Sequence, residues 1–488
     1  MTRSPTPDAS TGLVTDLYQL TMAYAYWKKG LAEREAVFHL SFRAQPFRGS
    51  FSLCCGLQSA LDFLANWHFD PTDLHYLETL RDQTGNRLFP DDFLDYLAEL
   101  HYTGDIEAIP EGTIVFPHQP LIRVRGPLLA AQLIESGLLN LINYQTLICT
   151  KAARICLAAA PTPVLEFGLR RAQGIDGALA ATRASYIGGC NATSSLWAGK
   201  QLGIPVRGTH AHSWVLAFDD ELTAFESFAD VYPDNCVFLV DTFDTLQGVQ
   251  HAIQVGKRLR ATGHQLVGVR LDSGDLGTLS HQARQLLDQA NFHQTVIVAS
   301  NDLDEHTIAH LKSQQAPIGI WGVGTRLVTA SDQPSLGGVY KLSALRDAQG
   351  LWQHKLKRSE NDEKHTLPGM LQVRRYYRNG APFGDMLYDE LTEQSNNAIP
   401  MSGNGEDLVM DDSLETEDLL TPVMRAGRVV APPPSLRQLQ QRTQRQLKQF
   451  GITSWEHRDR SATYHVTTER NFFDQTQKLL SAAKGTTS

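Results

Sequence analysis

The 488-residue sequence lacks the features that would point to a membrane, to export or to nucleic acid. It contains no run of about 18 apolar residues, so no membrane-spanning helix is expected. The N-terminal segment 1–11 is polar and has no apolar stretch of the kind that directs export. There is no basic tract, and the formal charge of −9 argues against a nucleic-acid or membrane-surface partner. We therefore expect small-molecule ligands.

Cysteine is also scarce, with six residues and no CxxC pair. Most of these cysteines stand among apolar residues, as reduced and buried thiols do. This usage predicts a cytoplasmic protein. The cysteines are Cys54, Cys55, Cys149, Cys156, Cys190 and Cys236.

The remaining composition is that of an ordinary soluble enzyme, with 42% hydrophobic and 20% charged residues and no internal repeat. At about 150 residues per domain, the length allows roughly three units, or a large α/β barrel with an added domain. A helix is predicted over 15–28, with Thr15 or Asp16 as its N-cap, and further helices between 57 and 100. Short strands separated by proline and glycine turns make the first domain, 1–127, rich in β-structure. These strands are predicted at 36–42, 104–109, 113–116 and 121–125.

Helical sequence over 128–158 opens a second region, 128–335, in which apolar runs alternate with helix-like segments. Such alternation predicts βα units around a parallel sheet or barrel. Polar residues cluster just after the runs, where the active-site loops of a barrel lie. The predicted strands are 163–167, 206–209, 236–240, 266–271, 295–299 and 318–321.

The third region, 336–488, turns strand-like again before a predicted linker at 396–417. A polar helix is expected to follow, entered through Pro432-Pro-Pro-Ser435, and the last few residues are expected to be frayed.

One segment places an acid, an aromatic ring and two guanidinium groups where an apolar strand ends: Glu166-Phe-Gly-Leu-Arg-Arg-Ala-Gln-Gly174. A planar guanidinium suits phosphate or carboxylate, and a phenyl face suits an aromatic ring. Phe167 beside Arg170 therefore predicts a ligand that is both aromatic and anionic. The alternative is a core phenylalanine with two surface arginines.

Two further strand ends carry polar groups. Strand alternation directs Arg270 and Asp272 to the same side, either as part of a site or as a structural ion pair, with Asp275 or Ser273 capping the next helix. In Ile318-Gly-Ile-Trp-Gly-Val-Gly-Thr-Arg326 the glycines and the threonine form either a phosphate cradle or a tight turn into a helix.

Histidines and aspartates follow two other strands. His210 and His212 are either a metal-binding pair, or a single reactive imidazole beside hydroxyls, or ordinary loop residues. Asp241 and Asp244 are candidates to hold Mg²⁺ through water or to orient a histidine, and helix capping by Asp244 is the alternative.

Taken together, these segments resemble nicotinate phosphoribosyltransferase, in residue types, order and spacing. The resemblance runs from about Thr15 to Ser359 and continues more loosely through Leu367-Pro-Gly and the C-terminal helix. The segments that carry it are Thr15-Asp-Leu-Tyr-Gln19, Glu166–Gly174, Gly208-Thr-His-Ala-His-Ser213, Val240-Asp-Thr-Phe-Asp-Thr245, Arg270-Leu-Asp-Ser-Gly-Asp275 and Gly322-Val-Gly-Thr325.

The resemblance implies an irregular α/β barrel of the type II phosphoribosyltransferase kind, joined to a β-rich domain built from both chain ends. It implies transfer of phosphoribose from phosphoribosyl diphosphate to nicotinate, coupled to ATP hydrolysis, with Mg²⁺ on the diphosphate. It also implies a head-to-tail homodimer whose subunits share active sites.

Site roles follow from the same resemblance. Phe167, Thr209 and Arg270 would surround nicotinate together with Tyr18 of a neighbouring subunit. Arg170 would contact phosphate, and Gly324 and Thr325 would hold the 5-phosphate. His212 would be phosphorylated by ATP, and Asp241 and Asp272 would assist the histidine, the ribose or the Mg²⁺. The Mg²⁺ ligands themselves are not assigned.

Departures from the family pattern are small: Trp214, Phe243 and Trp321 replace other aromatics, and Cys190 interrupts Tyr186-Ile-Gly-Gly-Cys-Asn-Ala-Thr-Ser194. The related nicotinamide enzyme places an aspartate near Thr193, so a neutral hydroxyl here suits a carboxylate substrate.

The alternatives to a nicotinate enzyme are a nicotinamide phosphoribosyltransferase, a metal-dependent barrel hydrolase using His210 and His212, and a non-catalytic nucleotide-binding relative.

Overall fold

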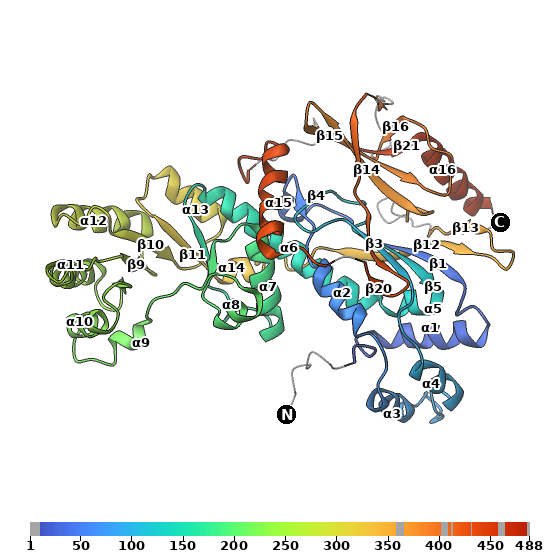
Figure 1. Cartoon of the computed structure of the whole chain (residues 1–488), viewed down its shortest axis with the longest axis horizontal. Helices are drawn as coiled ribbons and strands as arrows, with labels where there is room; N and C mark the ends of the chain where they lie inside the picture. The colour runs from blue at the N-terminus through green and yellow to red at the C-terminus, as the bar shows by residue number, and fades with distance from the viewer. Residues whose placement is uncertain are drawn as a thin grey trace.

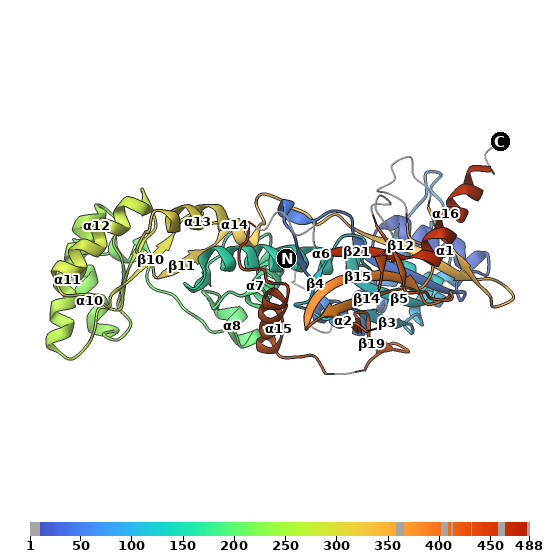
Figure 2. The ribbon, with the colours of Figure 1, turned by 90° about the horizontal axis from the view of Figure 1, so that it is seen from above.

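The computed structural model describes residues 10–357, 366–401, 408–410, 413–430, 432–456 and 464–485. Figures 1 and 2 show an elongated molecule with a parallel sheet and its helices at one end and antiparallel strands at the other. Helices α6 (Glu135–Ala159), α7 (Ile175–Gly188) and α15 (Leu436–Gln449) lie between the two ends. None of the helices in the described ranges is long and apolar enough to cross a membrane.

The parallel sheet is the centre of an irregular α/β barrel and has the strand order β7-β6-β11-β10-β9-β8. All of its strand pairs are parallel. Its strands are β6 (Val164–Glu166), β7 (Ala192–Thr193), β8 (Val237–Leu239), β9 (Gly268–Leu271), β10 (Val296–Ser300) and β11 (Ile320–Val323). Its further helices are α8 (Leu196–Leu202), α9 (His212–Val215), α10 (Glu221–Val231), α11 (Thr245–Ala261), α12 (Leu276–Gln289), α13 (Glu305–Ser313) and α14 (Thr325–Val328).

The barrel closes without a regular strand at 206–209, where the sequence predicts one. Val206 makes only an isolated parallel bridge to Thr193 of β7. On the other side, the Thr209 hydroxyl donates to the Val237 carbonyl, and the Leu239 amide donates to His210 Nε2 at 3.3 Å. Side chains therefore replace ladder hydrogen bonds between this segment and β8, and the barrel is irregular there.

The β-rich domain is built from both chain ends. Its larger sheet has the order β13-β12-β1-β5-β3-β19-β20, and all of its pairs are antiparallel. It combines β1 (Glu35–Phe42), β3 (Asp105–Ala108), β5 (Ile122–Pro127), β12 (Gly338–Arg346), β13 (Trp352–His354), β19 (Thr421–Arg425) and β20 (Arg428–Val429). The fold expected from the resemblance is confirmed.

A second sheet of this domain uses C-terminal residues only, in the order β17-β16-β21-β15-β14-β18. The linker predicted at 396–417 is wrong where the structure describes it, because it contains three strands of this sheet; residues 402–407 and 411–412 lie outside the described residues. The strands are β14 (Leu371–Arg378), β15 (Ala381–Asp389), β16 (Asn397–Pro400), β17 (Leu408–Val409), β18 (Glu415–Asp418) and β21 (His465–Glu469).

The remaining elements flank these sheets. Asp16 occupies the N-cap position of α1 without a capping side-chain bond, whereas Ser435 and Gln438 form a capping box that begins α15 as predicted. The predicted frayed end, 486–488, lies outside the described residues. These elements are α1 (Leu17–Lys28), a 3₁₀ turn (Pro46–Arg48), α2 (Leu57–Ala65), α3 (Pro71–Thr79), α4 (Asp91–Ala98), α5 (Leu128–Leu133), α16 (Arg470–Gly485) and the strand pair β2 (Ser52–Leu53) and β4 (Ile114–Val115).

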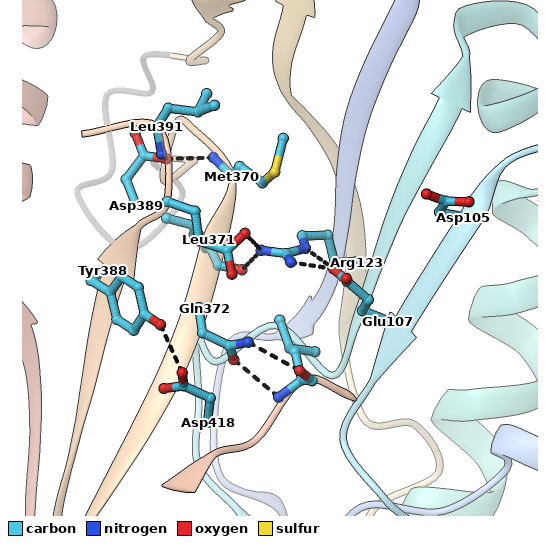
Figure 3. A network of polar contacts seen from close by, with 12 residues as sticks. Asp105, Glu107, Arg123, Met370, Leu371, Gln372, Tyr388, Asp389, Leu391 and Asp418 are labelled. Carbon is cyan, nitrogen blue, oxygen red and sulfur yellow. Dashed lines mark hydrogen bonds and ion pairs between the residues drawn. The ribbon is translucent and has the colours of Figure 1, made fainter. Parts of the chain in front are cut away.

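Arg123 joins the two sheets of the β-rich domain, as Figure 3 shows. Its guanidinium is nearly buried on β5 and donates to the Leu371 carbonyl of β14 at 3.0 Å. It also pairs with Glu107 of β3 and, at 3.0 Å, with Glu390. Because a buried cation needs several acceptors, this arrangement fixes the C-terminal sheet against the larger sheet of the domain.

A second buried ion pair holds the long helix α6 against the barrel. Glu305, at the start of α13, is fully buried and lies 2.7 Å from Lys151 Nζ and 2.8 Å from Arg154 Nε. Both cations are on α6. The barrel is therefore attached to the β-rich domain through a helix that both parts contact.

Candidate active site

The centre of the candidate site is the turn that follows β6. The Phe167 amide donates to the Val323 carbonyl at 2.7 Å, which ties the end of β6 to β11. A Cβ on Gly322 would lie 2.6 Å from the Phe167 ring, so glycine is required for the ring to lie against β11. The Arg270 guanidinium lies 5.5 Å from the centre of the same ring. Phe167 is therefore held between two strands with a cation beside it.

Arg270 and Asp272 lie on the same side of the chain, as strand alternation predicts. Arg270 Nη2 is 2.8 Å from Asp272 Oδ1, and Arg270 Nε donates to Ser300 Oγ at 2.8 Å. The Ser300 hydroxyl in turn donates to Asp272. The three side chains form a closed set at the ends of β9 and β10, and this set fixes the direction of the guanidinium.

Asp241 continues this set at the end of β8. Its Oδ2 accepts from the Asp272 amide at 3.0 Å and from the Ser273 hydroxyl at 2.5 Å. Its Oδ1 is buried and has no hydrogen-bond partner among the described residues. A buried carboxylate oxygen without a partner is costly, so this atom is available to a ligand. Asp244 and Asp275 instead cap α11 and α12, as their simpler interpretation predicts.

The two histidines have different surroundings. His212 begins α9 and is half-buried. Its Nδ1 lies 3.1 Å from Oγ1 of Thr242, the residue that follows Asp241 in the sequence. His210 is buried among Phe225, Phe228 and other aromatic rings. The pKa of His210 is lowered to about 4, mainly by burial, with smaller contributions from nearby Arg270 and His212 and an opposing effect of the Ala211 carbonyl. Because His210 Nε2 accepts from Leu239, it is a structural residue.

The histidine pair does not form a metal centre in the part of the chain that the structure describes. There, the one group with three closely placed metal-ligand types is Glu305, His306 and Asp332. Lys151 lies 2.7 Å from Glu305 and 2.8 Å from Asp332, and Arg154 also pairs with Glu305, so both carboxylates already have cationic partners.

The other residues predicted for the site differ in how close they lie to Phe167 and in whether they have partners. Gly324 directly precedes α14, which begins at Thr325, and a Cβ on Gly324 would lie 3.2 Å from the Phe167 carbonyl, so both residues adjoin the site. Arg170 is exposed and makes no hydrogen bond or ion pair within the described ranges. The Thr209 hydroxyl is bonded to the Val237 carbonyl.

Tyr18 is not brought to the barrel within one chain. It lies on α1, at the opposite end of the molecule, and 52% of its surface is exposed. Its hydroxyl accepts from the neighbouring Gln19 side chain at 3.0 Å.

Sequence reasoning missed Ser300 and Thr242, the hydroxyls that contact Arg270 and His212. Both follow the rule that found the others, because each stands at or just after the end of a barrel strand. They were overlooked because a single serine or threonine carries no charge pattern.

Comparison with known proteins agrees with this geometry. The chain matches the family models for the N-terminal domain of nicotinate phosphoribosyltransferase over residues 13–143 and for its C-terminal domain over 372–475. The nicotinate phosphoribosyltransferase of Bacillus subtilis (strain 168) is 48% identical over 388 residues, which cover 78% of this chain and 77% of the relative. This chain belongs to the nicotinate phosphoribosyltransferase family.

More distant relatives extend the match over most of the length. The human nicotinate phosphoribosyltransferase is 34% identical over 496 residues, covering 88% of this chain and 89% of the human one. A crystal structure of human nicotinic acid phosphoribosyltransferase superposes with a TM-score of 0.82 at 32% identity, covering 96% of this chain and all (100%) of that one. A nicotinate-nucleotide pyrophosphorylase from Pyrococcus furiosus, 20% identical with a TM-score of 0.70 over 93% of this chain and 99% of that one, shares the fold.

Proposed function

We propose that the protein is a nicotinate phosphoribosyltransferase, which makes nicotinate mononucleotide and diphosphate from nicotinate and phosphoribosyl diphosphate, for NAD synthesis. ATP hydrolysis to ADP and phosphate accompanies the reaction. The observation that carries this proposal is that Phe167, at the end of β6, lies beside the Arg270 and Asp272 pair, at the end of β9, in a member of this family. A ring, a cation and a carboxylate at one place suit an anionic pyridine and a ribose.

In the proposed site, nicotinate stacks on Phe167 and its negative charge faces Arg270, with Thr209 at the edge of the pocket and Tyr18 from a second subunit closing it. Arg170 contacts phosphate, and Gly324 and Thr325 hold the 5-phosphate. When diphosphate leaves, positive charge develops on the ribose. Holding the pyridine nitrogen in line with the broken bond then supplies much of the rate.

Asp241 and Asp272 are the residues that would hold Mg²⁺. Both offer carboxylate oxygens, which Mg²⁺ prefers together with substrate phosphates, and the partnerless Asp241 Oδ1 fits such a role. When bound, Mg²⁺ would neutralise charge on the diphosphate.

His212 is the proposed site of phosphorylation by ATP. Thr242 occupies its Nδ1, whereas Nε2 has no partner among the residues described. We therefore assign Nε2 as the nucleophile: it attacks the γ-phosphorus, the bond from that phosphorus to the bridging oxygen breaks, and ADP leaves. The phosphohistidine adds negative charge beside the diphosphate site, and its later hydrolysis releases phosphate.

At the level of the whole protein, we propose a cytoplasmic homodimer with shared active sites and domain boundaries at 127/128 and 335/336. These boundaries follow the end of β5 at Pro127 and the start of β12 at Gly338.

The test is a product assay with phosphoribosyl diphosphate, Mg²⁺ and either nicotinate or nicotinamide, with and without ATP. We expect nicotinate mononucleotide and diphosphate in equal amounts, and more product when ATP is present. If nicotinamide gives product and nicotinate does not, the protein is a nicotinamide phosphoribosyltransferase instead. If neither base gives product, the proposal is refuted.

A further inference from the structure

Glu166, the last residue of β6, is buried to 1% exposure, and neither lysine nor arginine contacts it within the described ranges. A carboxyl group in such a place must be compensated by hydrogen bonds. Its Oε2 accepts from the Thr193 hydroxyl at 2.6 Å and lies 2.9 Å from the Thr182 hydroxyl. Its Oε1 accepts from the Gly168 amide. The donors therefore come from β7, from α7 and from the turn that follows Glu166 itself.

The bond to Gly168 shapes the turn that carries Phe167. Because the side chain binds the amide two residues on, the backbone must fold tightly around Phe167. The turn also has no room to relax: a Cβ on Gly168 would lie 2.1 Å from a Val328 methyl and 2.8 Å from Glu166 Oε1. Glu166 thus holds the turn that carries Phe167, and the Phe167 ring lies against Gly322 of β11.

The Thr193 hydroxyl already uses its one proton and an acceptor lone pair in hydrogen bonds within the protein. Thr193 is completely buried; its hydroxyl gives its one proton to Glu166 and accepts from the Ser195 amide at 3.0 Å. It has no proton left for the carboxylate of a substrate. An aspartate at this position would instead place a second carboxylate beside Glu166.

We infer that Glu166 is a positioning residue for the aromatic base, held by Thr182 and Thr193, and that Thr193 affects base selection through Glu166 and not by touching the substrate. This inference rests on the proposed function, because it concerns the binding of nicotinate to Phe167. It assigns a purpose to a buried carboxyl group that the proposed reaction does not use.

The first experiment compares Glu166→Gln, Thr193→Val and Thr193→Ser by steady-state kinetics and by calorimetric binding of nicotinate. Glu166→Gln and Thr193→Val should each raise KM for nicotinate by about tenfold, the loss expected for one charge-assisted hydrogen bond, and should change KM for phosphoribosyl diphosphate by less than about twofold. Thr193→Ser keeps the hydroxyl donor, so its KM for nicotinate should stay near that of the wild type. Equal effects on both substrates, or no difference between the serine and valine variants, would overturn the inference.

The matched control is Thr84→Val. The Thr84 hydroxyl donates to Asp82 at 2.7 Å in an exposed turn of the β-rich domain. It has the same chemistry as Thr193 but lies outside the barrel, so its kinetics should match the wild type. Melting temperatures identify any variant that is merely unfolded; if Glu166→Gln does not fold, the comparison of serine and valine at position 193 carries the test.

The second experiment separates two explanations for the effect of an aspartate at position 193. If Thr193→Asp fails because two carboxylates meet, the Glu166→Gln/Thr193→Asp double variant should recover at least about tenfold in kcat/KM, since a glutamine amide can donate to the new carboxylate. If the aspartate repels nicotinate itself, the double variant will be no better than Thr193→Asp, and the inference fails. A wild-type protein inactive on both bases would refute the proposed function instead, so the two failures are distinguishable.

Discussion

At the residue scale, the site depends on which ring nitrogen or carboxylate oxygen already has a partner. His210 and His212 look equivalent in the sequence, but His210 Nε2 accepts from the Leu239 amide, whereas within the described ranges the one partner of the His212 ring is Thr242, at Nδ1. The same reasoning sets Asp241, whose Oδ1 has no partner in the part of the chain that the structure describes, apart from the helix-capping Asp244. Local chemistry therefore separates residues that pattern alone groups together.

For His212→Ala we expect loss of stimulation by ATP while a slower, ATP-independent turnover remains, because the base and ribose contacts do not involve this ring. Initial rates with and without ATP, and acid-labile labelling by ATP carrying radioactive γ-phosphate, measure both effects. His264→Ala is the control, since the Nδ1 atom of His264 also contacts a loop side chain, in this case the Asp234 carboxylate at 2.7 Å. Full ATP coupling in His212→Ala would refute the phosphohistidine assignment.

At the element scale, the apolar runs predicted the barrel strands β6, β8, β9, β10 and β11. Arg270 and Asp272 could be placed together because alternation along one strand decides which side they share. The irregular closure at Val206 could not be predicted, since its contacts are made by side chains of Thr209 and His210. The strand β16 was missed because it is short, follows a polar segment that resembles a loop, and has its partner β21 distant in sequence.

The closure beside β8 should weaken in acid. The pKa of His210 is about 4 in the folded protein, below the ordinary 6.5, so the folded protein binds fewer protons than the unfolded one between these values. Neutral His210 therefore contributes to the free energy of unfolding above pH 6.5. This contribution, on the order of 3 kcal/mol, is lost as the pH falls toward 4. In urea unfolding between pH 6.5 and 4, the free energy of unfolding of His210→Gln should fall less steeply than that of the wild type, because glutamine retains an acceptor but cannot titrate. Identical declines would contradict the assignment.

Protonation of His210 also removes the acceptor for the Leu239 amide. We expect hydrogen exchange in the peptide 237–240, corrected for the intrinsic effect of pH, to accelerate below pH about 5 before the rest of the sheet does. Uniform protection of all barrel strands at that pH would be the contrary result.

Arg123 tests how the two sheets of the β-rich domain are joined. Arg123→Leu should lower the free energy of unfolding by about 3 kcal/mol, because Glu107, Glu390 and the Leu371 carbonyl lose a nearly buried donor. Arg87→Leu is the control: Arg87 also contacts two carboxylates, but 39% of its side chain is exposed, and a loss below about 1 kcal/mol is expected. Equal losses from urea unfolding of both variants would show that Arg123 does not join the sheets.

At the scale of the whole molecule, Tyr18 and the barrel lie at opposite ends of one chain, and Tyr18 is 52% exposed. A head-to-tail dimer would bring the tyrosine of each subunit to the barrel of the other. Tyr18→Ala and Arg270→Ala should then each impair activity, while their mixed dimers contain one site with both native residues. After dissociation and reassociation of an equal mixture, about half of the dimers are mixed, and about a quarter of wild-type activity should return. Mixing the two variants without exchange of subunits is the control. If the activity after exchange stays at the average of the two variants, Tyr18 contributes to the active site of its own chain or to no active site.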